Sequence, residues 1–303
     1  MFTSLLINSL SKTIIDFSTP FMYNINELTS LEEELSKASK KGMKIGLVPT
    51  MGALHDGHLE LIKQARTHTE YVIVSIFINP LQFNQTDDFL NYPSNPSKDL
   101  NKLKNAGVDL LFSPDTKLIY PKKPTVKIDF GSITKNLEGA FRYGHFEGVG
   151  IIVMKLFNLI KPNVAFFGLK DLQQYVFIKN LIKEFSYPIK LIGVPTVREE
   201  NGLALSSRNA HLSPSGFAIA SQIYKGLIWA KNNFKSLQSS EVLILKLKKF
   251  YQKQKGLSIE YCEILNSSTF KPIKSLKGKG RITLCVAAYV EGVRLIDNIF
   301  LQE

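Results

Sequence analysis

Two histidines, His55 and His58, have the type and spacing of groups that handle phosphate. An apolar run precedes them, Gly52 and Gly57 flank His55, and apolar residues recur at helical spacing after them. This order predicts a strand, a tight turn and a helix start, where glycine lets backbone approach a ligand and unpaired N–H groups of the first helical turn attract anions. Imidazole N–H groups, neutral or charged near pH 7, would add donors. We therefore predict a phosphate site, with a capping or packing role for one histidine as the alternative.

Three more polar clusters follow apolar, strand-like runs. Gln82, in Asn-Pro-Leu-Gln-Phe, offers a donor and an acceptor to a small polar substrate. Lys170 opens a helix after a run that ends at Gly168, and Gln174 follows one turn later on the same side. Residues 206–208, Ser-Ser-Arg, end a long polar loop and supply hydroxyl donors and a guanidinium fork that suit a triphosphate. The plainer interpretations are a turn, a solvated Lys–Asp pair and a helix cap.

Alternating strands and helices must position these clusters. We expect strands at 43–48, 71–78, 108–112, 163–168 and 189–195, and helices at 26–40, after 58, at 97–106, at 149–160 and after 170. This alternation predicts a Rossmann-like α/β fold, a parallel sheet with right-handed crossovers whose ligands gather at the carboxyl ends of the strands. Two helices (214–234 and 241–254) and three strands (258–266, 281–289 and 293–301) then predict a smaller α+β unit with a hairpin turn at Glu291-Gly292.

The run Pro-Thr-Met-Gly-Ala-Leu-His-Asp-Gly-His at 49–58 resembles the ATP-binding signature of the pantothenate synthetase (pantoate:beta-alanine ligase) family, within the His-x-Gly-His nucleotidyltransferase superfamily. The motifs at 79–83, 170–174 and 195–208 resemble that family in the same order, and the last is the counterpart of the superfamily's mobile Lys-Met-Ser-Lys-Ser loop. The resemblance runs from Met22 to the end. It implies an AMP-forming carboxylate-amine ligase that condenses (R)-pantoate with beta-alanine through pantoyl adenylate, consuming ATP and releasing pyrophosphate.

The resemblance also implies roles for individual residues. Catalysis would rest on His58, His55, Lys170 and Arg208, pantoate would contact Gln82 and Gln174, and Mg²⁺ would be held in part by Asp99. ATP would be bound by Met51, Gly52, Ala53, Leu54, His55, Asp56, Gly57, His58, Gly168, Leu169, Lys170, Asp171, Val197, Leu205, Ser206, Ser207 and Arg208. His145, in a Gly-His-Phe that the family shares, is expected to cap or pack rather than to do chemistry.

Two departures from the family pattern bear on the metal and on ATP. Lys98-Asp99 stands where relatives carry two adjacent acids, and Leu169 replaces a glutamate. With only Asp99 left of the acidic pair, we expect magnesium to bind through an altered site or mainly through the nucleotide phosphates. The equal alternative for Asp99 is an acid at a helix start that offsets the helix dipole.

Three segments are expected: an N-terminal extension at 1–21, poorly ordered; a Rossmann-like ATP- and pantoate-binding domain at 22–196; and a smaller C-terminal α+β lid domain at 197–303. The extension has no basic stretch ahead of its apolar run and no clear small-residue cleavage site. A true start at Met22, a loosely ordered arm and a weak targeting segment remain open.

Composition narrows the alternatives. Hydrophobic residues make up 44% of the 303 residues, no apolar stretch is long enough to cross a bilayer, and the two cysteines are too few for a disulfide framework, so we expect a cytoplasmic protein. The net charge of +12 is spread over lysines without an arginine-rich tract or a nucleic-acid module, which argues against nucleic acid as a partner.

Zinc is disfavoured because His55 and His58 lack a third ligand at matching distance. Another adenylyl or cytidylyl transferase and a nucleic-acid-binding protein are the rival functions, and a homodimer is implied by the resemblance.

Overall fold

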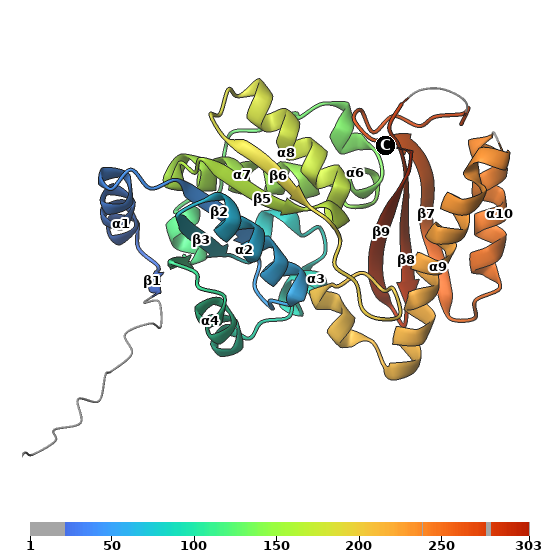
Figure 1. The fold of residues 1–303 in the computed structure, drawn as a ribbon, viewed down its shortest axis with the longest axis horizontal. Coiled ribbons are helices and arrows are strands. Elements are labelled where there is room, and N and C mark those ends of the chain that lie inside the picture. The colour runs from blue at the N-terminus through green and yellow to red at the C-terminus, as the bar shows by residue number, and fades with distance from the viewer. Residues whose placement is uncertain (1–21, 238, 277–279, 303) are drawn as a thin grey trace, which may run out of the picture.

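The computed structural model describes residues 22–237, 239–276 and 280–302. Its larger sheet has six parallel strands in the order β1-β4-β3-β2-β5-β6 (Figure 1). These strands are β1 (Tyr23–Ile25), β2 (Ile45–Thr50), β3 (Tyr71–Ile76), β4 (Leu110–Phe112), β5 (Val164–Gly168) and β6 (Lys190–Val194). The chain runs from β2 outward to β3 and β4 and then resumes at β5 on the other side of β2. The β2/β5 boundary is therefore the switch point of the sheet, where open α/β sheets bind ligands.

Helices connect these strands and cover both faces of the sheet. The longer ones are α1 (Leu28–Lys40), α2 (Asp56–His68), α4 (Pro96–Asn105), α7 (His145–Ile160) and α8 (Leu172–Glu184). The short ones are α3 (Thr86–Leu90), α5 (Thr116–Ile119), α6 (Glu138–Phe141) and the 3-10 turns η1 (Pro80–Gln82), η2 (Ser132–Lys135), η3 (Leu169–Asp171) and η4 (Ser207–His211).

Alternate residues of the central strands enter two different cores. Leu47 of β2 packs in the core that includes α1, α7 and α8, whereas its neighbour Val48 packs in the core that includes α2 and α4. Ile73 and Val72 of β3 divide in the same way. Because successive side chains of a strand point to opposite faces, a strand covered on both sides needs an unbroken apolar run.

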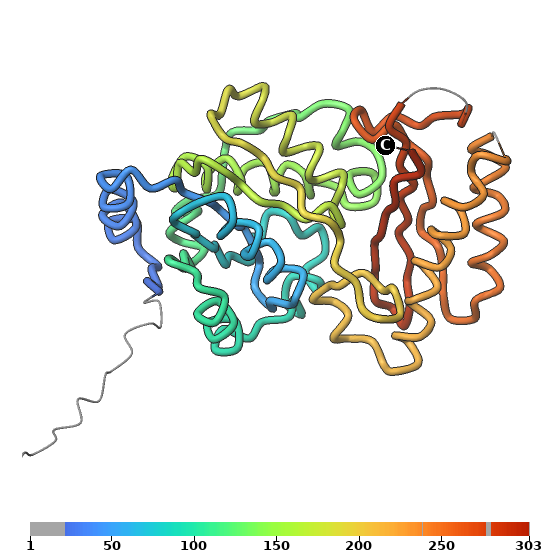
Figure 2. The backbone as a smooth tube through the Cα atoms, in the orientation of Figure 1, coloured from blue at the N-terminus to red at the C-terminus, as the bar shows by residue number. Residues whose placement is uncertain are grey.

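The smaller sheet is antiparallel and contains β7 (Leu257–Asn266), β8 (Ile282–Val290) and β9 (Val293–Gln302). Helices α9 (Pro214–Leu237) and α10 (Ser240–Gln252) cover one face, where Leu284 and Val286 lie in their core. The opposite face, with Cys285 and Ala287, joins the core of the larger sheet. The smaller sheet thus stands between the parallel-sheet body and the helix pair (Figure 1). Figure 2 shows the chain crossing from the first part to the second through the segment after β6.

The structure confirms the predicted fold class, a parallel α/β sheet followed by a smaller α+β part. Strand β1 was not expected, and several bounds differ by two or three residues; the largest difference is that the helix expected at 149 begins at His145. Gly148 lies in the first turn of this helix and does not interrupt it. A Cβ at this position would stand 2.3 Å from the carbonyl oxygen of Leu81, so the glycine allows the two backbone segments to approach closely.

The proposed segments fare differently. The extension at 1–21 lies outside the described residues. The boundary between 196 and 197 stays a prediction, which the placement of β1–β6 before it and β7–β9 after it supports. Within the described part of the chain, no helix is long and apolar enough to span a membrane.

Candidate active site

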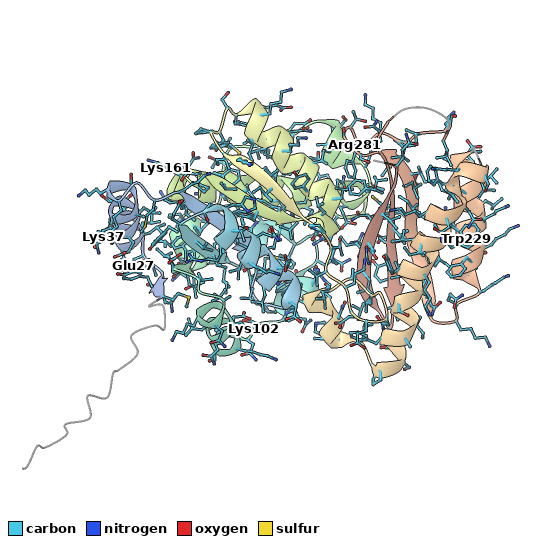
Figure 3. The ribbon with its side chains drawn as sticks, in the orientation of Figure 1. Glu27, Lys37, Lys102, Lys161, Trp229 and Arg281 are labelled. Carbon is cyan, nitrogen blue, oxygen red and sulfur yellow. The ribbon has the colours of Figure 1, made fainter. Side chains whose placement is uncertain are left out.

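The turn after β2 is held in a strained shape by α4. Gly52 and Ala53 both have positive φ, +86° and +48°, and the second is costly for a residue with a side chain. The carboxylate of Asp99 accepts the N–H of Ala53 and of Leu54, each at 2.8 Å. Lys102, labelled in Figure 3, donates to the carbonyl oxygen of Leu54 at 2.5 Å. Helix α4 therefore holds the turn through its two backbone N–H groups and through one carbonyl oxygen.

The two histidines fold back on the start of α2. The Nδ1 of His55 accepts the N–H of Gly57 at 3.1 Å, and the Nδ1 of His58 accepts the N–H of His55 at 3.3 Å. Gly57 must lack a side chain, because a Cβ there would lie 2.8 Å from the His55 ring. The N–H groups of His58 and Leu59 bond to the carbonyl oxygen of His55. The expectation of unpaired N–H groups at this helix start was therefore wrong for these positions, because the rings and the cap residue satisfy them.

Burial and nearby charges set the protonation state of the two rings, and the same hydrogen bonds set their tautomer. Burial, followed by the charges of Lys170 and Lys102, lowers the pKa of His55 to about 4. Burial, the neighbouring His55 and the same lysines lower the pKa of His58 well below its usual value. Both rings are therefore neutral at pH 7. Of the two states that the sequence left open, neutral or charged, the structure favours the neutral one. Since each Nδ1 accepts a hydrogen bond, each ring carries its proton on Nε2.

A second turn lies across the switch point, where β5 leads through η3 to α8. Lys170 and Gln174 both line the cavity described below. The adjacent Gln173 differs: its Nε2 donates to the carbonyl oxygens of Ile133 and Asn136, both at 2.8 Å, and its Oε1 accepts the N–H of Glu138. Gln173 therefore holds backbone, which leaves Gln174 as the glutamine of the pair available to a ligand.

The loop after β6 is anchored at its base and reaches the first turn at its tip. Arg198 makes a two-pronged ion pair with Asp297 at 2.6 and 2.9 Å. The Ser207 hydroxyl donates to the carbonyl oxygen of Ala53 at 3.2 Å, and Ser206 caps η4 through the N–H of Arg208. The Arg208 guanidinium pairs with Asp88 at 3.0 and 3.1 Å. The two predicted nucleotide segments are thus joined directly.

Gln82 is oriented by its own loop. Asn79 donates to the Gln82 Oε1 at 3.1 Å, and the Gln82 Nε2 lies 2.8 Å from the sulfur of Met51. The Nδ1 of His145 lies 2.9 Å from the Gln82 carbonyl oxygen. His145 is buried, and burial lowers its pKa to about 4, so it serves as a neutral packing group, in line with its expected role. Each end of the Gln82 amide has one partner, which leaves one N–H and one acceptor position for a ligand.

A cavity of about 270 Å³ brings most of the predicted site together. Its lining includes Met51, His55, Gly57, His58, Gln82, Gly168, Lys170, Asp171, Gln174, Val197, Leu205, Ser206, Ser207 and Arg208. The other residues predicted to contact ATP, namely Gly52, Ala53, Leu54, Asp56 and Leu169, are not among the lining residues. Gly52, Ala53 and Leu54 form the turn after β2, and the contact of all five residues with a ligand stays a prediction.

The predicted metal ligand Asp99 does not line the cavity either. It is 3% exposed and its two oxygens each accept a backbone N–H. No cluster of three or more His, Cys, Asp or Glu side chains that could hold a metal occurs in the described part of the chain. The geometry is that of a carboxylate that anchors a loop.

Sequence reasoning missed several residues that line the cavity, among them Glu138, Arg142, Asp297 and Asn298. Glu138 is buried, yet hydrogen bonds from Arg294 outweigh burial and lower its pKa to about 2. The available signal was the polar pair Asp297-Asn298 inside an otherwise apolar strand pattern, since buried polar groups need partners.

The fold and the site together are those of an α/β protein suited to binding phosphate, in which two neutral imidazoles and the cations Arg142, Lys170 and Arg208 line a cavity at the switch point of a parallel sheet. Residues 23–300 match the family described as pantoate-beta-alanine ligase, and the chain belongs to that family.

Individual relatives agree with the family match. The chain is 43% identical to the pantothenate synthetase of Cytophaga hutchinsonii, over 92% of this chain and 99% of the relative. Among solved structures, pantothenate synthetase from Thermus thermophilus is 35% identical with a TM-score of 0.86, covering 93% of this chain and all of that one. Pantoate-beta-alanine ligase from Francisella tularensis, solved with beta-gamma ATP and beta-alanine, is 37% identical with a TM-score of 0.76, covering 93% and 99%. The resemblance read from the motifs is confirmed, and the chain is a ligase that joins pantoate to beta-alanine to produce pantothenate.

Proposed function

We propose that the cavity carries out this ligation in two steps with ATP as a substrate. A carboxylate oxygen of pantoate attacks the α-phosphorus of ATP, and the bond from that phosphorus to pyrophosphate breaks, giving pantoyl adenylate. The amine of beta-alanine then attacks the carbonyl carbon, loses a proton and displaces AMP. AMP is a far better leaving group than hydroxide. The Francisella tularensis relative was solved with beta-gamma ATP and beta-alanine, which supports ATP and beta-alanine as substrates of this chain.

The observation that carries the proposal is the pair of neutral imidazoles. His55 and His58 are tied at Nδ1 and keep an Nε2–H, so they can donate hydrogen bonds but cannot serve as acids of ordinary pKa. Donors fixed before the reaction cost no reorganisation when charge grows on the phosphate oxygens. We assign His58 to the α-phosphate, because His58 lies in the first turn of α2 behind the cap residue His55.

The cations and amides of the cavity suit the remaining parts of the substrates. Lys170 and Arg208 would bind the phosphate oxygens that carry the most charge. Because Arg208 pairs with Asp88, ATP must compete with that carboxylate for the guanidinium. Gln82 and Gln174 are neutral and would position pantoate through hydrogen bonds rather than through charge.

Magnesium is proposed to enter with ATP. The anchored carboxylate of Asp99 and the lack of a metal-binding cluster among the described residues do not fit a metal held by the protein alone. Mg²⁺ commonly keeps several waters and binds substrate phosphates, so the nucleotide can supply its ligands.

Three further parts belong to the proposal: a cytoplasmic location, which the cysteine count favours, a C-terminal lid at 197–303, and a homodimer, which rests on the family resemblance. Light scattering would test the homodimer, and a monomer at micromolar concentration would contradict it.

Pyrophosphate release tests the proposed chemistry. With ATP and pantoate but no beta-alanine, the protein should release about one pyrophosphate per site and retain pantoyl adenylate, recoverable after an acid quench. ATP alone should give none. Lys170→Ala should slow the burst by roughly 10²-fold or more. Lys179→Ala, at an exposed lysine on the following helix α8, should leave the burst unchanged. Release that needs beta-alanine, or that occurs without pantoate, would contradict an adenylate intermediate.

A further inference from the structure

The last strand of the smaller sheet holds the turn that carries Lys170. The side-chain Nδ2 of Asn298, on β9, donates to the carbonyl oxygen of Leu169 at 2.9 Å and to that of Lys170 at 2.8 Å. An amide nitrogen has two hydrogens, and both are used on consecutive peptide groups of η3. The Asn298 side chain that makes these two bonds is itself buried, with 7% of its surface exposed.

The neighbouring side chain holds the other nucleotide segment. Asp297 follows the strand alternation to the opposite face of β9, where it pairs with Arg198 at the base of the loop after β6. Asp297 also accepts the N–H of Asn298 at 2.8 Å. Two adjacent residues of one strand therefore contact the two segments that contribute Lys170 and Arg208, at opposite faces of the sheet.

The chemistry of position 298 is selective. Two carbonyl oxygens within hydrogen-bond distance require a donor with two hydrogens, which asparagine supplies without charge. Aspartate has almost the same shape but offers only acceptors, so its oxygens would face the carbonyl oxygens of Leu169 and Lys170 and repel them. Alanine would leave both carbonyl groups without this partner.

We propose that Asn298 is a positioning residue for Lys170. By holding η3 at two points, it fixes the backbone from which the ammonium reaches the nucleotide, so that binding of ATP and formation of the adenylate require the smaller sheet to be docked. This inference rests on the proposed role of Lys170. It goes beyond that role because it assigns part of the nucleotide site to a residue of the smaller sheet.

A double-mutant cycle tests the proposal. We would measure single-turnover formation of pantoyl adenylate, with kcat and KM for ATP and for pantoate, in Asn298→Ala and Asn298→Asp, each with Lys170 and with Lys170→Ala. With Lys170 present, kcat/KM for ATP should fall roughly 10- to 100-fold in Asn298→Ala and further in Asn298→Asp, as expected for losing two hydrogen bonds. In the Lys170→Ala background the same changes should cost less than about threefold, because residues that act through one another are not additive.

Controls separate positioning from folding. Asn266→Asp is the matched variant, since Asn266 lies at the end of β7 in the same sheet and uses only its side-chain oxygen, which accepts from Ser268 and Thr269. It should keep full activity. If Asn298→Asp does not fold, the uncharged Asn298→Ala completes the cycle, with circular dichroism confirming its native content at the assay temperature.

The outcomes are distinct. Equal fold losses in both Lys170 backgrounds, or activity of Asn298→Ala within twofold of the parent, would overturn the positioning role while leaving the proposed chemistry intact. A parent protein that forms no adenylate from ATP and pantoate would overturn the proposed chemistry, and this inference with it.

Discussion

Replacing Asp99 with asparagine separates an anchoring carboxylate from a metal ligand. The carboxylate accepts two backbone N–H groups, from Ala53 and Leu54, in a site that is 3% exposed. An amide of the same shape has one oxygen, so one N–H would face the NH₂ group and lose its partner. A hydrogen bond to a charged group contributes about 1.5 to 3 kcal/mol. On the sequence alone we expect Asp99→Asn to be mild; with this geometry we expect the free energy of unfolding to fall by about 2 kcal/mol.

Magnesium titration provides the discriminating assay. Adenylate formation would be followed at saturating ATP and pantoate while free magnesium is varied, in the parent, in Asp99→Asn and in Asp87→Asn, an exposed carboxylate on α3. We expect the half-saturating magnesium concentration to stay within about threefold in all three proteins, because Asp99 does not bind the ion. The reasoning would be refuted if Asp99→Asn raised the magnesium requirement by roughly two orders of magnitude, about 2.7 kcal/mol, with no change in the free energy of unfolding.

Three other predictions follow from the same contacts. His58→Ala should lower kcat for adenylate formation by roughly 10²- to 10³-fold, the usual loss of one fixed donor, with a smaller change in KM for ATP; a rate within threefold of the parent would make His58 structural. Gln82→Ala and Gln174→Ala should each weaken pantoate use by about 1 to 3 kcal/mol and leave ATP affinity intact, and calorimetry showing loss of ATP with pantoate retained would reverse the assignment. Burial lowers the pKa of His55 and of His145 from 6.5 to about 4, so the unfolded chain binds more protons between these values. The free energy of unfolding should therefore fall as pH drops from 6.5 to 4, by up to about 1.4 kcal/mol per pH unit for each imidazole; urea titrations that show no slope in the parent would contradict buried neutral rings.

Strands β2–β9 and the local motifs were predictable from sequence because their causes are local. A parallel strand buried on both faces shows as an apolar run, and Lys170 and Gln174 are close in space because only four residues separate them at the start of a helix. The start of α7 was missed because Gly148 serves contact with a distant backbone segment. Local patterns could draw attention to Asp99 and Asn298 but not to their anchoring roles, since their partners Leu54 and Lys170 lie 45 and 128 residues away along the chain.

The histidine pair shows a different limit. The sequence placed His55 and His58 at one site, and both line the cavity, but it expected unpaired backbone N–H groups of the helix to act as donors beside the rings. The rings satisfy backbone N–H groups through Nδ1 and keep Nε2 free of that task. Only the side-chain rotamers decide between these two arrangements, and spacing in the sequence does not fix rotamers.

The smaller sheet is covered on both faces, by α9 and α10 on one side and by the core of the parallel sheet on the other. A sheet built in this way cannot leave one neighbour without exposing a row of apolar side chains that includes Cys285 and Ala287. Local opening of the interface is therefore expensive, and the two sheets should melt in one cooperative transition rather than in two. The two sheets are separate in topology but should be coupled in stability. A fragment cut after β6 would expose the part of its core that β7–β9 cover, and we expect such a fragment to aggregate rather than fold.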